Sequence, residues 1–144
     1  MDEAELKQRT KQFGIRIIRL VETLGYDPTA KVIGMQLLRA GTSVGANYRS
    51  ACQGKSLPDF ITKLSIALEE ADEAMYWMEM LVEANIVPAN KLESLMREGK
   101  EIVAILTASH KTARQNLSKH SINNPSSESK KLKIGNGKWK ISST

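Results

Sequence analysis

The sequence predicts an all-α protein of four helices followed by a disordered C-terminal tail. Apolar residues recur every three or four positions in four stretches, and no stretch is clearly a strand. A short connection after the second stretch favours an antiparallel arrangement of neighbouring helices. At 144 residues, the chain fits one domain with enough apolar content for a core.

The first helix is predicted over residues 2–24, with Gly25 as a C-terminal cap. Three arginines, Arg9, Arg16 and Arg19, lie on a face away from the apolar stripe. Charged helical faces usually meet water, so a solvated face is the favoured interpretation of these arginines. Contact with phosphate is the alternative.

The second helix opens at Asp27-Pro28, a capping residue followed by a first-turn proline, and ends near Gln53-Gly54. One of its faces is apolar, and a stripe of small residues lies beside that face. The small residues are Gly34, Gly41, Gly45 and Cys52. Each helical glycine costs roughly 1 kcal/mol, so the pattern predicts that another backbone or a ligand comes close. We therefore expect this helix to be packed on more than one side, by its own bundle and by a second copy of the chain.

A polar stripe on the same helix is the best candidate for a functional surface. Its members are Gln36, Arg39, Ser43, Asn47 and Ser50. The stripe either binds a ligand or forms a hydrogen-bonded seam between helices, and the seam is at least as consistent with the residues.

The third helix is predicted from Ser56, with Pro58 in its first turn, to about Ala84. A long apolar stripe marks its core-facing side. A second apolar set, Ile66, Trp77 and Met80, points roughly the opposite way, which predicts a second contact surface. Self-association is the leading explanation for that set. The many acids of this helix make it unsuited to phosphate.

The fourth helix is predicted over residues 89–116, after the break at Pro88. The bundle is therefore assigned to residues 1–117. Residues 118–144 are rich in Ser, Asn and Lys and are predicted to be a disordered tail. The lysines of the tail, including Lys130 and Lys131, together with Trp139, could attract and stack on nucleic acid. A nonspecific solubilising tail is favoured over that role.

The net charge of +5 is unevenly placed along the chain. Six of the 21 basic residues and one of the 16 acidic residues lie from Ser118 onward, so residues 1–117 contain 15 of each. The excess positive charge is therefore confined to the tail. This distribution weakens any argument from charge that the bundle binds nucleic acid.

Signals of enzyme chemistry are nearly absent from the sequence. The two histidines, His110 and His120, lack the Glu-x-x-His spacing of di-iron bundles, and no phosphate-binding glycine loop follows a strand. Cys52 is expected to be a packing residue and not a nucleophile. A single cysteine also fits a protein of the reducing cytoplasm. We predict no cofactor, no metal, no small-molecule substrate and no membrane span.

Two motifs resemble a known family. Residues 35–49 read MQLLRAGTSVGANYR, and residues 59–68 read DFITKLSIAL. Together they resemble the Q-L-R-R/S-A/G-x-S-V/I-x-x-N and D/E-F-x-x-K/F-L signature of the four-helix bundle proteins encoded within intervening sequences of bacterial 23S rRNA genes, also called S23 ribosomal protein-like. Residues 70–77 are similar to the family's E-x-x-E-T-x-Y-W segment, and the match covers roughly residues 13–114. Ser50 departs from the pattern, because many members carry an acid there.

The resemblance implies an antiparallel up-down-up-down four-helix bundle that assembles into a homo-oligomer, usually a homopentamer. It implies no established catalytic activity, and it favours association with RNA or DNA. The signature positions that carry over are Arg39, Ser43 and Asn47.

We therefore predict a non-enzymatic, cytoplasmic, oligomeric bundle that associates with RNA or DNA. The expected contact residues are Arg39, Ser43, Asn47, Arg9, Arg16, Arg19, Lys130, Lys131 and Trp139. The expected oligomer interface contains Ile66, Trp77 and Met80. The alternative is a structural or protein-interaction scaffold without nucleic-acid contact, in which the polar stripe ties helices together.

Overall fold

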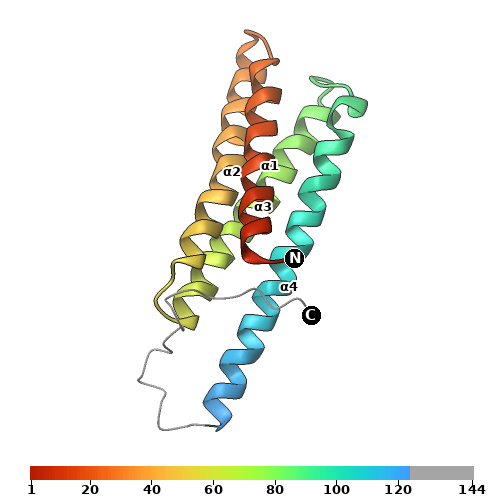
Figure 1. The fold of residues 1–144 in the computed structure, drawn as a ribbon. Coiled ribbons are helices and arrows are strands. Elements are labelled where there is room, and N and C mark those ends of the chain that lie inside the picture. Colours follow the sequence, from red (N-terminus) through yellow and green to blue (C-terminus); the bar gives the residue numbers. More distant parts are fainter. Residues whose placement is uncertain (124–144) are drawn as a thin grey trace.

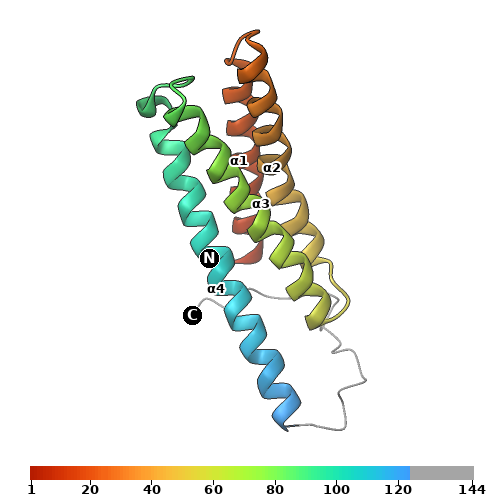
Figure 2. The same ribbon diagram turned by 180° about the vertical axis from the view of Figure 1, so that it is seen from behind.

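Four helices account for the fold, which is seen from two sides in Figures 1 and 2. The structure is a computed structural model that describes residues 1–123. The helices are α1 (Glu3–Glu22), α2 (Pro28–Cys52), α3 (Leu57–Glu83) and α4 (Ala89–Asn123). Each runs antiparallel to the helix before it (Figure 1), which confirms the predicted bundle.

The helices pack in chain order. α2 packs against both α1 and α3, and α3 packs against α4, whereas α1 and α4 share the least extensive interface. α2 is thus held on two sides by its own bundle. In residues 1–123 no helix is long and apolar enough to cross a membrane.

The helix starts follow the predicted capping chemistry. The side chain of Asp27 accepts a hydrogen bond from the N–H of Ala30 at 3.0 Å, and Ser56 accepts from the N–H of Asp59 at 3.2 Å. Both residues have extended backbones and satisfy donors that the first helical turn leaves unpaired. Gly25 follows the end of α1 with a φ of 76°, a left-handed conformation that suits glycine.

The predicted end of the fourth helix is wrong. α4 continues to Asn123 instead of ending at Asn116, so the division at residue 117 falls inside a helix. Leu117 lies one turn after buried Ala113 and is itself partly buried against the core. No glycine or proline follows until Pro125. The helix therefore runs on past the connection between α2 and α3 (Figures 1 and 2).

The core lies along the centre of the bundle and takes residues from all four helices. Its largest fully buried side chains are Tyr48, Phe13, Leu6, Ile17, Leu37, Leu64, Met78, Leu81, Leu92, Ile102, Leu106 and Val44. Leu37, Val44 and Tyr48 belong to the apolar face of α2, which is buried as its spacing predicted.

Glycines on α2 allow the close approach of α1. A Cβ atom on Gly45 would lie 3.3 Å from both the carbonyl carbon of Thr10 and the backbone nitrogen of Lys11. A Cβ on Gly41 would lie 3.3 Å from the Cβ of Ile17. The glycines are therefore explained by a neighbouring helix, in agreement with the prediction that another backbone comes close.

Candidate nucleic-acid interface

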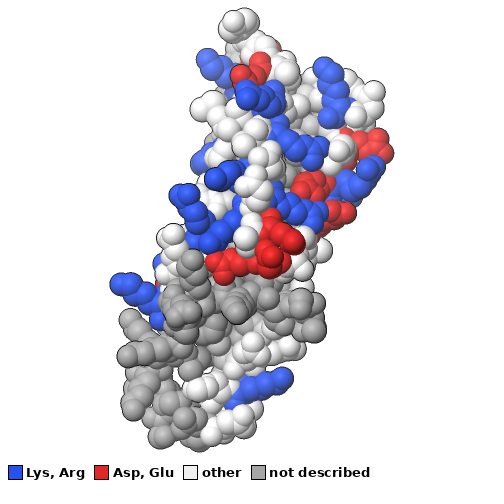
Figure 3. Space-filling view, viewed as in Figure 1, with Lys and Arg blue, Asp and Glu red and all other residues white. Residues whose placement is uncertain are grey.

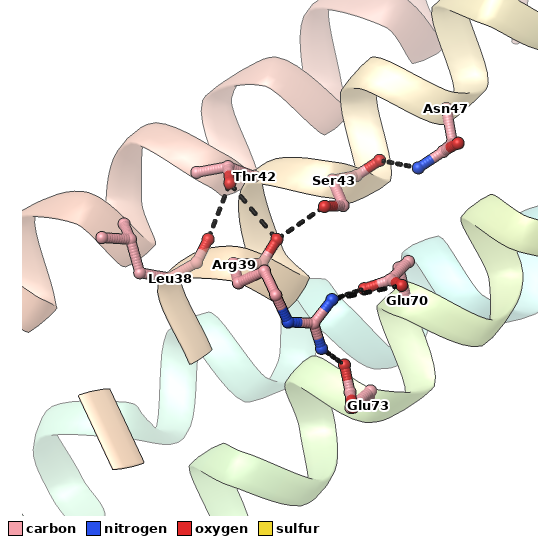
Figure 4. Close-up of polar contacts among 7 residues, drawn as sticks. All are labelled: Leu38, Arg39, Thr42, Ser43, Asn47, Glu70 and Glu73. Atoms are coloured by element: carbon pink, nitrogen blue, oxygen red, sulfur yellow. Dashed lines mark hydrogen bonds and ion pairs between the residues drawn. The ribbon is translucent and has the colours of Figure 1, made fainter. Parts of the chain in front are cut away.

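Arg39 is the centre of the polar stripe on α2, and its side chain reaches across to α3 (Figure 4). One guanidinium nitrogen, Nη1, donates to Oε2 of Glu70 at 3.1 Å, and Nη2 pairs with the carboxylate of Glu73. These contacts raise the pKa of Arg39, mainly through the hydrogen bond to Glu73. Arg39 therefore ties α2 to α3, as the seam interpretation predicted.

Among the described residues 1–123, Ser43 and Asn47 form hydrogen bonds only to their own helix (Figure 4). The hydroxyl of Ser43 donates to the carbonyl oxygen of Arg39 at 2.7 Å, and Nδ2 of Asn47 donates to that of Ser43 at 2.8 Å. Such bonds back to the preceding turn are common for short polar side chains in helices. The seam interpretation is thus wrong for these two residues. Both side chains are partly exposed.

The arginines of α1 also bind partners within the bundle. The guanidinium of Arg9 makes two hydrogen bonds to Glu98 on α4 and also pairs with Glu101. Arg16 donates to the hydroxyl of Ser94 at 2.9 Å. Arg19 pairs with Glu22 on the same helix at 3.0 Å. The prediction of a purely solvated arginine face is therefore incomplete, because Arg9 and Arg16 join α1 to α4.

Arg9 and Glu98 stabilise each other's charged forms. The hydrogen bond from Arg9 holds the pKa of the Glu98 carboxyl below its usual range, and Glu98 in turn raises the pKa of Arg9. A phosphate group would have to compete with these carboxylates. Arg9 and Arg39 are consequently weaker candidates for nucleic-acid contact than their charge alone indicates.

The C-terminal part of α4 has the opposite character. No acidic residue occurs between Glu101 and Glu128, whereas Lys111, Arg114 and Lys119 are exposed. These three cations form no ion pair within residues 1–123. In Figure 3 the lower part of α4 shows basic but no acidic side chains.

The cationic end of α4, defined by Lys111, Arg114 and Lys119, was missed at the level of sequence. Dividing the chain at residue 117 separated these residues between the bundle and the tail. The useful signal was the acid-free run after Glu101, which coincides with a continuing helical pattern through Leu117. The predicted contacts Lys130, Lys131 and Trp139 lie outside the described residues.

The predicted oligomer interface is only partly open to solvent. Ile66 and Met80 on α3 are 40% and 36% exposed. Trp77 is partly buried against the core, and its ring meets that of Tyr76 edge to face at 5.1 Å. Trp77 lies on the side of α3 that carries Glu70, which pairs with Arg39 of α2, so Trp77 is less exposed than Ile66 and Met80. Its neighbour Tyr76 is 52% exposed.

Cys52 and Tyr48 are buried neighbours near the C-terminal end of α2. Burial raises the pKa of the Cys52 thiol to about 11 and also raises the pKa of Tyr48. A thiol that stays protonated is a poor nucleophile, which agrees with a packing role for Cys52. In residues 1–123 no group of three or more His, Cys, Asp or Glu side chains is arranged to hold a metal ion.

Comparisons with known proteins agree on one family. A family model described as 23S rRNA-intervening sequence protein matches residues 2–108. A solved structure of a protein with unknown function, from the S23 ribosomal protein family of Bacteroides thetaiotaomicron VPI-5482, is similar with a TM-score of 0.71 and 38% sequence identity. That similarity covers 76% of this chain and 97% of the other. The comparison with curated proteins finds no match.

Proposed function

The chain belongs to the 23S rRNA-intervening sequence protein family, and we propose that it is a non-enzymatic, oligomeric binding protein for RNA or DNA. The nucleic-acid contact is made by the cationic end of α4. Self-association of the bundle brings several copies of α4 together. The single observation that carries this proposal is the acid-free cluster of Lys111, Arg114 and Lys119 on α4, which forms no ion pair within residues 1–123.

The position of the cluster supports phosphate binding. α4 projects past the connection between α2 and α3 (Figures 1 and 2), and its cations Lys111, Arg114 and Lys119 are exposed. Lys111 and Arg114 are three residues apart and share a helical face. Cations without carboxylate partners are available to neutralise phosphates, which is the main source of nonspecific nucleic-acid affinity.

Self-association is the second part of the proposal. Ile66, Tyr76 and Met80 expose apolar surface on α3, and the family resemblance favours a homopentamer. Several copies would present several cationic α4 ends to one nucleic acid, and effective concentration would multiply weak individual contacts. The free thiol of Cys52 fits the reducing cytoplasm, where we place the protein.

The test is a binding titration of the full chain against a fluorescently labelled single-stranded RNA and the matching DNA duplex. The salt concentration is varied from about 50 to about 300 mM, a range over which counterion release changes the affinity strongly. We expect the logarithm of affinity to fall linearly with the logarithm of salt. The variant Lys111→Glu/Arg114→Glu should bind more weakly, with a slope reduced by about 1 for each phosphate that is no longer neutralised.

A matched control is Lys31→Glu/Lys91→Glu. It makes the same change of charge in the first turns of α2 and α4, where an acidic residue suits the helix dipole. This control should keep the wild-type affinity and slope. If the α4 variant keeps both as well, the α4 end is not the contact. If the wild type binds neither probe at the lowest salt, the nucleic-acid proposal is wrong.

A scaffold without nucleic-acid contact is the second candidate, and the ion pairs favour it. Arg9 and Arg39 direct their charge to Glu98, Glu70 and Glu73 within the bundle. Two of the arginines expected to contact phosphate are therefore already paired with carboxylates. A full-chain oligomer that binds no nucleic acid at low salt would support this candidate.

A further inference from the structure

A groove runs along the outer surface between α1 and α2. Its volume is about 440 Å³, and its floor includes Gly14, Gly45 and Ala46. The glycines bring the two helix backbones together, so few side chains fill the space above the crossing. Ile15 and Ile18 of α1 form an apolar wall and are each 37% exposed.

The rim of the groove is basic. Lys7, Lys11 and Arg49 line it, and no acidic residue does. Lys7 pairs with Glu3 at 2.9 Å, whereas Lys11 and Arg49 are exposed and form no ion pair within residues 1–123. An apolar wall beside unpaired cations fits an amphipathic helix that carries acids beside its apolar residues.

The exposed face of α3 has this character. Ile66, Tyr76 and Met80 are exposed, and their spacing of ten and four residues keeps them on one side of the helix. Acids lie among and beside them, and none of these acids forms an ion pair within the described part of the chain: Glu69, Asp72, Glu79 and Glu83. The face is thus both acidic and apolar.

The two surfaces also agree in length. The groove extends along α1 from Ala4 to Ile18, and the apolar face of α3 extends from Ile66 to Met80. Each span covers about 21 Å at the helical rise of 1.5 Å per residue. α1 and α3 do not pack against each other within the bundle, so the two surfaces are separate parts of one molecule.

We propose that the groove between α1 and α2 of one copy receives the exposed face of α3 of a second copy. Lys11 and Arg49 then pair with acids such as Glu69 and Asp72, while Ile15 and Ile18 pack against Ile66, Tyr76 and Met80. The contact joins two different surfaces, so repeating it builds a closed ring or an open chain. This inference rests on the self-association proposed above and is independent of nucleic-acid binding.

The test is the mass of the full-length particle, measured by size-exclusion chromatography with light scattering. We expect Lys11→Glu/Arg49→Glu to convert the oligomer to a monomer, because like charges would then face each other. Glu69→Lys/Asp72→Lys should do the same from the other side of the contact. The chain that carries all four substitutions should recover the oligomer, because its charges are complementary again.

Two controls accompany this charge swap. Lys31→Glu/Lys91→Glu makes the same change of charge away from the groove and should keep the wild-type mass. Helical circular dichroism should be unchanged in every variant, because all the substituted side chains are exposed.

Each outcome separates this inference from the nucleic-acid proposal. An oligomer that survives both double substitutions would show that the groove is not the interface, while self-association would stand. Failure of the fourfold variant to reassemble would overturn the pairing of these charges. A monomeric wild type would overturn both self-association and this contact, and an acidic helix of another protein would then be the better occupant. None of these results bears on whether Lys111 and Arg114 bind nucleic acid.

Discussion

Arg9 on α1 and Glu98 on α4 form a bidentate ion pair that joins the first and last helices of the bundle. Nε of Arg9 donates to Oε2 of Glu98 at 2.8 Å, and Nη2 donates to Oε1 at 2.6 Å. Both side chains are largely shielded from water, and the pair spans the least extensive of the helix interfaces. Bidentate charged hydrogen bonds of this kind are stronger and more directional than neutral ones.

We predict that Arg9→Gln lowers the free energy of unfolding at pH 7 by about 1.5–3 kcal/mol, the usual contribution of a hydrogen bond to a charged group. The pKa of Glu98 is lowered in the folded state, so its contribution is present above the unfolded value near 4.5 and is lost as the pH falls through the folded value. The difference between wild type and variant should therefore shrink in acid. Urea denaturation of both proteins at several pH values measures this difference in the free energy of unfolding.

Arg19→Gln is the matched control for this prediction. Arg19 is also on α1, but within residues 1–123 it pairs only with Glu22 of the same helix, and both side chains are mostly exposed. Its loss should change stability by less than about 0.5 kcal/mol. Equal effects of the two substitutions, or a difference that does not depend on pH, would show that Arg9 and Glu98 do not act as a pair.

Gly41→Ala and Gly14→Ala should have opposite effects on stability. A Cβ on Gly41 would crowd the Cγ2 and Cβ of Ile17, at 3.2 and 3.3 Å. Ile17 is fully buried and β-branched, so it cannot easily rotate away. The crowding should outweigh the helical preference of alanine and lower the free energy of unfolding by about 1 kcal/mol.

Gly14 faces the same crossing from α1 but has more room. The nearest atoms to its Cβ would be the carbonyl oxygen of Gly41 and the Cα of Thr42, both at 3.5 Å. This is ordinary van der Waals contact, so the gain in helical preference should dominate and raise stability by up to about 1 kcal/mol. Thermal unfolding compares the two variants. A stabilising Gly41→Ala would mean that the helices separate at little cost.

Much of the fold could be predicted because it depends on local patterns. The caps at Asp27 and Ser56 and the buried face with Leu37 and Val44 follow from residue type and helical spacing alone. The close approach at Gly45 could also be predicted, because glycine is costly in a helix unless something needs the space.

The candidate site was less predictable because it depends on which side chains meet. Spacing placed Arg39, Ser43 and Asn47 on one stripe but could not show that only Arg39 reaches another helix. Trp77 lies next to exposed Tyr76 in sequence, yet a rotation of about 100° per residue turns it towards the core.

Cys52 should react with thiol reagents only when the protein unfolds. The residue is fully buried, and its pKa is raised to about 11 in the folded state. At pH 7.5 the native protein should therefore label far more slowly than the same protein in urea. Labelling of the native protein at the rate of the unfolded chain would show that the end of α2 opens readily.

The same thiol predicts a loss of stability at alkaline pH. The pKa of the Cys52 thiol in the folded state is raised above its ordinary value of 9.0. The protonated thiol therefore makes its full contribution to the free energy of unfolding below pH 9. This contribution is lost as the pH rises towards 11, by up to about 2 kcal/mol. The wild type should therefore lose more stability than Cys52→Ala over this range. Parallel loss in both proteins would assign the effect to other groups.

Arg39→Gln and Asn47→Ala should separate the two interpretations of the polar stripe. Arg39 links α2 to Glu70 and Glu73 on α3, so its loss should lower the melting temperature. Because the Arg39 side chain is 49% exposed, salt screens the attraction, and the effect should be smaller in 500 mM than in 50 mM salt, roughly a threefold change in screening length. Asn47 bonds only to its own helix, and Asn47→Ala should leave the melting temperature nearly unchanged.

Lys31→Gln provides the control for Arg39, because Lys31 is an exposed cation of α2 that forms no ion pair within residues 1–123 and does not line the groove. It should not change the melting temperature at either salt concentration. Melting is followed at protein concentrations that span the association range, because association also raises apparent stability. A large drop for Asn47→Ala at every concentration would mean that Asn47 reaches a partner beyond its own helix, and a ligand or a second copy would then be the first place to look.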